Sequence, residues 1–181
     1  MEGNRFGSVF VYFIILIGCI PVILSRKQSY DALNVDVINN PGRIFSTNLK
    51  LVGRDRLING TMELMADITH KEKISAFFYS NSGGGYKIMP LMVPEEDSCS
   101  VIRSYYKQFI KDSFKLGINT DFDFRLCPLP KGVYWFKDVS LDNRNWVSVL
   151  PRGLMKMILN FTDNGEFVGG FEFVIDIKDK Y

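Results

Sequence analysis

Apolar and polar residues alternate along most of the chain beyond its N-terminal segment, and Gly, Asn and Pro interrupt the alternation at short intervals. A period of two is typical of strands that bury one face. β-branched and aromatic residues, which fit a pleated sheet, are frequent in the same segments. The pattern predicts strands at residues 31–38, 44–57, 60–69, 73–79, 85–92, 132–139, 153–162 and 166–178.

The segment 154–162 indicates which face of its strand is buried. Met155, Met157 and Phe161 share one face with Leu159, and Asn160 lies on the other. Asn160 begins the glycosylation triplet Asn-Phe-Thr, and a glycan must point to solvent. The Met/Phe face is therefore expected to point inward, together with the matching face of the next strand, which carries Phe171 and Phe173.

Two turns can join these strands. A two-residue turn would set Phe161 opposite an outward residue, whereas a three-residue loop at 163–165 pairs Phe161 with Phe167 and Met157 with Phe171. The three-residue loop brings both apolar faces together, so it is the predicted connection.

The segment 60–69 gives a similar result. Met62 and Leu64 form its apolar face, and Asn59, in the triplet Asn-Gly-Thr, falls on the polar face as a glycosylation site should. A turn at 70–72 would pair Leu64 with Phe78.

Helical periodicity is clearest at about residues 98–116, which Gly117 follows. One face is apolar and includes Tyr105 and Phe109, and the opposite face carries a cationic stripe. The helix either packs against a sheet as part of an ordinary core or forms a lid over an apolar ligand.

Composition supports a single folded domain. The 181 residues are 46% hydrophobic and 14% aromatic, enough for a sizeable core. The net charge is +2 with interspersed signs, which argues against a nucleic-acid-binding surface.

The N-terminus carries a short apolar run, from Val9 to Leu24, preceded by Arg5. We interpret residues 1–25 as a signal peptide and 26–181 as one secreted domain without a stable membrane span. An uncleaved signal anchor is an alternative, and the run ending at Cys19 also looks like a bacterial lipoprotein cleavage box.

Removal of the signal leaves two cysteines, Cys99 and Cys127, an even pair that predicts one disulfide in an oxidising compartment. Closing a loop of about 29 residues would stabilise the fold by about 3.5 kcal/mol in a chain-entropy estimate. A reactive thiol at Cys99 is the alternative, but the only histidine, His70, falls in a predicted surface turn.

Catalytic motifs are missing from the sequence. No Gly-x-Ser-x-Gly or His-Glu-x-x-His occurs, and the few His and Cys residues do not form a usual zinc set. We expect no enzyme, no catalytic residue, no metal site and no cofactor.

Three segments resemble the insect CheA/CheB chemosensory proteins, and CheA in particular: residues 52–68, 119–139 and 145–153. The most specific piece is Cys-Pro-x-x-Lys-Gly-x-Tyr at 127–134, with a helix that carries Cys99 upstream. The resemblance extends from about residue 31 to 179. The family is distantly similar to the ganglioside activator protein and to the lipid-recognition fold.

That resemblance implies a secreted glycoprotein with a hydrophobic interior and a role in gustatory response to pheromones. The expected fold is a mainly antiparallel β-sandwich or cup, immunoglobulin-like or lipid-recognition-like, of roughly seven to nine strands with one helix. The expected ligand is a lipid or cuticular hydrocarbon, presented to a chemosensory receptor. Ten inward residues are candidates for the cavity wall: Met62, Leu64, Phe78, Tyr105, Phe109, Met155, Met157, Phe161, Phe171 and Phe173.

Two alternatives stay open. The same ten residues could fill a dry core. The protein could instead be a secreted interaction module without a small ligand, which would bind a partner through exposed apolar residues such as Tyr79, Met89, Leu91, Met92 and Val93.

Overall fold

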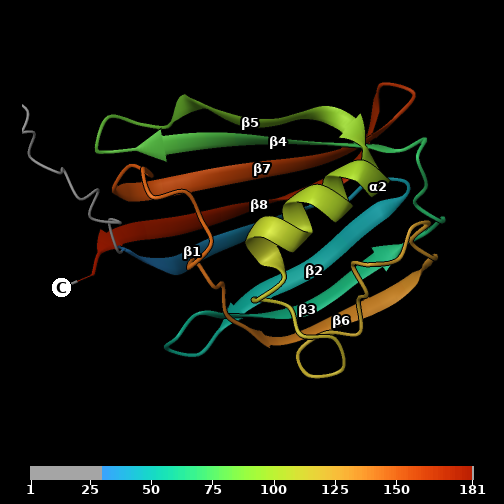
Figure 1. Cartoon of the computed structure of the whole chain (residues 1–181), viewed down its shortest axis with the longest axis horizontal. Coiled ribbons are helices and arrows are strands. Elements are labelled where there is room, and N and C mark those ends of the chain that lie inside the picture. Colours follow the sequence, from blue (N-terminus) through green and yellow to red (C-terminus); the bar gives the residue numbers. More distant parts are fainter. Residues whose placement is uncertain (1–29, 181) are drawn as a thin grey trace, which may run out of the picture.

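The computed structural model describes residues 30–180, which form two antiparallel sheets and one helix (Figure 1). Eight strands lie in this range: β1 (Tyr30–Asn40), β2 (Phe45–Val52), β3 (Leu57–Leu64), β4 (Lys73–Asn81), β5 (Lys87–Asp97), β6 (Gly132–Val139), β7 (Gly153–Asp163) and β8 (Glu166–Asp179). The larger sheet has the order β1-β8-β7-β4-β5 and the smaller one β2-β3-β6. The predicted antiparallel β-sandwich is confirmed. The predicted signal peptide lies outside the described residues.

The two sheets meet where β2 passes β1 and β8. The side-chain amide of Asn39 in β1 donates to the Leu49 carbonyl (3.0 Å) and accepts from the Leu49 N–H (2.9 Å). On the β8 side, the Ile44 N–H donates to the Val168 carbonyl at 3.2 Å. Gly169 follows with a φ of 138°, and a Cβ there would collide with the Phe45 backbone. A glycine is therefore required where β8 crosses β2.

The helix crosses the open side of the sandwich, in front of the strands (Figure 1). It begins as the α-helical turn α2 (Ser98–Val101) and continues as the π-helical segment η1 (Ile102–Ile110). The wider turn is evident where the Lys111 N–H donates to the Tyr106 carbonyl, five residues earlier, at 2.9 Å. The predicted helix is present but ends at Ile110 rather than near residue 116.

The helix presents the two faces that its sequence predicts. Apolar residues recur in adjacent pairs every four positions and are buried or half-buried. On the opposite face Arg103 and Lys107 are exposed, and so are Lys111 and Lys115, which follow the end of the helix. Between residues 30 and 180, no helix has both the length and the apolar character that a membrane span requires.

The predicted pairing of Leu64 with Phe78 is wrong. Strand β3 pairs with β2 and β6, so Leu64 lies opposite Phe45 and Gly132. The segment between β3 and β4 crosses from one sheet to the other instead of forming a hairpin. Ile68, which is fully buried, holds this crossing through a pair of backbone hydrogen bonds with Leu129 (2.8 and 2.9 Å).

The predicted three-residue loop between β7 and β8 is also wrong. A two-residue turn at 164–165 joins the strands, and both of its residues have positive φ, 52° and 81°. These angles suit the type I′ turn that matches strand twist. Phe167, predicted to point inward, is 50% exposed.

A β-bulge restores the match between the two apolar faces. The register shifts by one residue at Val168, which is fully buried. As a result Met157 lies opposite Phe173, and Leu159 lies opposite Phe171. The inward faces of β7 and β8 therefore still coincide, through a two-residue turn and a bulge rather than through the predicted three-residue loop.

Candidate ligand cavity

A cavity of about 340 Å³ lies between the two sheets and the helix. Both sheets contribute to its wall, and the helix closes one side with residues from Val101 to Ile110. Close-packed protein interiors contain few voids larger than a water molecule, so a space of this size is unusual for a filled core. It falls at the lower end of the range of about 300–1,000 Å³ that is typical of small-molecule sites.

All ten residues that the sequence singled out lie on the wall of this cavity. From the smaller sheet come Met62 and Leu64. The larger sheet contributes Phe78, Met155, Met157, Phe161, Phe171 and Phe173, and the helix contributes Tyr105 and Phe109. Strand alternation brings the eight strand residues together, because each strand turns one face to the interior. Helical periodicity places Tyr105 and Phe109 on the helix face that closes the cavity.

An aromatic cluster joins the helix to the smaller sheet. The ring of Tyr106 stacks on that of Phe124 with centroids 4.3 Å apart. Phe124 also contacts Phe114 and Phe122, at 5.2 and 4.4 Å, and Phe122 meets Tyr134 of β6 edge-on at 4.9 Å. Such contacts are favourable beyond the area that they bury. They hold the C-terminal half of the helix over the cavity.

A disulfide holds the start of the helix. Cys99 in α2 and Cys127, just before β6, are bonded, with Cα atoms 5.7 Å apart. The predicted disulfide is confirmed, and it indicates an oxidising environment. At the other end of the helix, the Trp146 indole donates to the Phe109 carbonyl at 3.1 Å. The helix is thus tied down at both ends.

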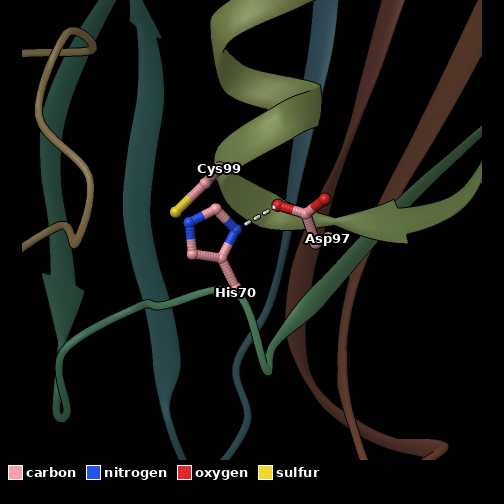
Figure 2. Close-up of side chains that lie close together, drawn as sticks. All are labelled: His70, Asp97 and Cys99. Carbon is pink, nitrogen blue, oxygen red and sulfur yellow. Dashed lines mark hydrogen bonds and ion pairs between the residues drawn. The ribbon is translucent and has the colours of Figure 1, made fainter.

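His70, Asp97 and Cys99 form a cluster beside the start of the helix (Figure 2). Their potential ligand atoms lie within 4.8 Å of one another. The Cys99 sulfur is already bonded to Cys127, so it does not offer the thiolate that a metal ligand requires. We therefore assign the cluster a structural role.

That role is to cap the helix. Asp97 is the N-cap: it accepts from the Ser100 N–H at 2.9 Å and from His70 Nδ1 at 2.8 Å. Hydrogen bonds from Ser100, through its side chain and then its backbone, and from His70 lower the pKa of Asp97 to about 2. The capping group is therefore a carboxylate at neutral pH.

The cavity wall carries no Asp, Glu, Lys, Arg or His among the described residues. Its polar groups are hydroxyls and one indole. Burial raises the pKa of the Tyr106 phenol, and the Asp123 carboxylate raises it further, so this phenol is neutral at physiological pH. An uncharged wall offers apolar contact and a few hydrogen bonds, but no acid, base or anion-binding group.

Among the polar wall residues that sequence reasoning missed is Thr47. It lies in β2 on the inward face, between Phe45 and Leu49 along the strand and opposite Met62 of β3. Thr47 is 7% exposed, and its hydroxyl has no hydrogen-bond partner within residues 30–180. A buried hydroxyl without a partner costs about 1–3 kcal/mol. Its parity with Phe45 and Leu49 is the signal that would have revealed it.

The two glycosylation candidates lie away from the cavity. Asn160 lies in the middle strand of the larger sheet, on the face opposite Met157, and is half-buried. Asn59 lies in the middle strand of the smaller sheet, where its amide donates to the Asp138 carboxylate at 3.2 Å. Glycosylation at either position remains a prediction.

The five apolar residues predicted to form an exposed patch differ in how exposed they are. Met92 is 49% exposed, but Val93 is buried, and Tyr79, Met89 and Leu91 are half-buried. The expectation of exposure at Val93 is wrong, because alternation in β5 turns it inward. Pro90 and Pro94 belong to the same strand, which is an edge strand, where proline is tolerated.

Residues 73–157 match the family DUF1091, described as a protein of unknown function. The matched segment begins with β4 and ends within β7, so it contains both cysteines of the disulfide, the helix and β6. The chain matches no curated protein.

Proposed function

We propose that this protein is a secreted carrier or presenter of small apolar molecules. The observation that carries the proposal is the cavity of about 340 Å³ and its uncharged, mostly aromatic and aliphatic wall. Apolar walls with few polar groups are typical of sites that enclose small ligands. Met62, Met155 and Met157 suit such a site, because their flexible side chains adapt to ligands of different shape.

A secreted location is part of the proposal. The disulfide between Cys99 and Cys127 favours an oxidising compartment. The apolar N-terminal run, interpreted as a signal peptide, and the two glycosylation triplets point to the same compartment. Secretion places the carrier where it can meet molecules from outside the cell.

The resemblance to insect CheA/CheB proteins specifies the biological setting that we propose. It suggests contact chemosensation, in which the protein binds a lipid or cuticular hydrocarbon pheromone and presents it to a gustatory receptor. The match of residues 73–157 to DUF1091 is compatible with this proposal and does not itself name a function.

A second candidate is an interaction module that holds no small ligand. It is favoured by exposed apolar side chains on the edge strand β5 and next to it: Tyr86 (39%), Ile88 (64%) and Met92 (49%). An edge strand with apolar side chains can pair with another chain. On this hypothesis the cavity would stay empty, and changes at wall residues other than Met92, which borders both surfaces, would not affect partner binding.

A cavity-filling variant distinguishes the two. Ala76 lies in β4 on the cavity wall and is 3% exposed, so a larger side chain there occupies the space that a ligand would need. We expect Ala76→Phe to weaken uptake of the fluorescent apolar probe phenylnaphthylamine by about tenfold or more, since the probe and the ring compete for one volume. The matched control is Ala66→Phe, because Ala66 is exposed and off the wall.

Equal probe binding by the wild type, Ala76→Phe and Ala66→Phe would contradict the carrier proposal. So would a wild-type protein that takes up no apolar probe. Circular dichroism spectra of the three proteins establish that any loss of binding is not a loss of fold.

A further inference from the structure

The hydroxyl of Thr47 stands out among the polar groups of the cavity wall. Two other polar groups of the wall form hydrogen bonds within the protein. Ser113 Oγ accepts from the Asp142 N–H at 2.8 Å, and the Trp146 indole donates to the Phe109 carbonyl. Thr47 Oγ1 is buried and, in the part of the chain that the structure describes, makes no hydrogen bond. Buried hydroxyls are nearly always paired, so an unpaired one calls for an explanation.

Packing does not explain it. Valine has nearly the shape of threonine and would fill the same place among Phe45, Leu49 and Met62 without an unpaired polar group. Thr47 lies on the same inward face of β2 as two apolar wall residues, so its side chain borders the cavity. Rotation about the Cα–Cβ bond exchanges the hydroxyl with the methyl group, so the hydroxyl can be turned toward a bound molecule.

The charge of the wall limits what that molecule can be. A carboxylate or ammonium group inside the cavity would find no opposite charge, because no ionisable Asp, Glu, Lys, Arg or His lines it in residues 30–180. Burying an unpaired charge is strongly unfavourable. A neutral oxygen needs only one donor, which Thr47 can supply.

We propose that the cavity is built for an uncharged chain molecule that carries an oxygen atom, such as a long-chain ester, ketone or alcohol, rather than for a pure hydrocarbon. The ligand oxygen accepts a hydrogen bond from the Thr47 hydroxyl, and the hydrocarbon part packs against the aromatic and methionine side chains. The inference rests on the proposed carrier function, and of the two ligand classes named there, lipid and hydrocarbon, it selects the oxygen-bearing lipid.

Three probes of equal carbon number test the proposal on the full-length protein: tetradecane, dodecyl acetate and the tetradecanoate ion. Each is used to displace phenylnaphthylamine from the wild type, Thr47→Val and Thr47→Ser. We expect the wild type and Thr47→Ser to prefer dodecyl acetate over tetradecane by about three- to tenfold, the range that one net hydrogen bond provides. Thr47→Val should lose that preference, and tetradecanoate should bind most weakly to all three proteins.

The outcomes separate this inference from the carrier proposal. If the proteins take up phenylnaphthylamine but bind tetradecane and dodecyl acetate equally, or if Thr47→Val keeps the preference, the ligand class is wrong and the carrier proposal stands. If no apolar molecule binds, both fail.

Thermal melting of the ligand-free proteins provides a second test. Thr47→Val should melt no lower than the wild type, because it removes an unpaired buried hydroxyl. A clearly lower melting temperature would show that the hydroxyl already has a partner within the protein, and would overturn the inference.

Discussion

The side-chain amide of Asn39 forms two hydrogen bonds with the backbone of a single residue, Leu49, in the other sheet. It accepts from the Leu49 N–H and donates to the Leu49 carbonyl, as a neighbouring strand would. Leu49 is buried and lines the cavity. This contact therefore fixes the seam, which is the line along which β1 of the larger sheet meets β2 of the smaller sheet at the edge of the cavity.

Removal of this amide should destabilise the fold. Asn39→Ala leaves both backbone groups of Leu49 without their partner, so we expect the free energy of unfolding to fall by about 2 kcal/mol, measured by urea denaturation. The control is Asn40→Ala, since the Asn40 amide makes a single long contact of 3.4 Å with Glu172. Its effect should stay within about 0.5 kcal/mol. Equal losses in the two variants would show that the amide does not hold the seam.

The disulfide should contribute more than any single hydrogen bond. We expect the double variant Cys99→Ala, Cys127→Ala to lose about 2–4 kcal/mol of stability, because the chain between the two residues gains freedom in the unfolded state. Wild-type protein that is unfolded and refolded in a thiol reductant should have the same stability as the double variant. The reductant should not change the stability of the double variant itself. A double variant as stable as the oxidised wild type would refute this.

The cap at Asp97 predicts a dependence on acid pH. The pKa of Asp97 is about 2 in the folded protein against an ordinary value of 3.8, so the folded state favours the carboxylate. The stability that this group adds is therefore complete above about pH 4 and is lost as the pH falls toward about 2.

Asp97→Asn tests this dependence, because it keeps a capping oxygen but cannot ionise. The wild type should melt higher than the variant at neutral pH, and the difference should disappear near pH 2. Glu96→Gln removes a charge from the neighbouring exposed residue and should show no such convergence. A constant difference across the acid range would contradict the assignment of Asp97 as the titrating group.

Much of the fold follows from alternation alone, and so does the composition of the cavity wall. A period of two assigns each strand side chain to a face, which is why Met157, Phe171 and the other six strand candidates lie on the wall, while helical periodicity places Tyr105 and Phe109 there. Pairing does not follow from alternation. Leu64 and Phe78 belong to neighbouring strands in the sequence but to different sheets, because Ile68 and Leu129 redirect the chain between them.

Two further features could not be predicted for physical reasons. The bulge at Val168 shifts the register by one residue, and nothing in the apolar pattern distinguishes it from a longer turn. Thr47 and Asn39 are polar residues in strands, and such residues are ordinarily expected to face solvent. The parity of Thr47 with Phe45 and Leu49 places it on the inward face, but only the structure shows that its hydroxyl has no partner within residues 30–180 and that Asn39 bonds across the seam.

The most direct test of the carrier proposal is native mass spectrometry with organic extraction of the glycoprotein secreted from insect cells. We predict a co-purifying long-chain molecule that Phe171→Gln on the cavity wall abolishes. It should persist in Phe167→Gln, where the same change is made at a half-exposed residue of the same strand. A clean ligand-free mass for the wild type, with no uptake from a panel of apolar molecules, would contradict the account and favour the interaction module.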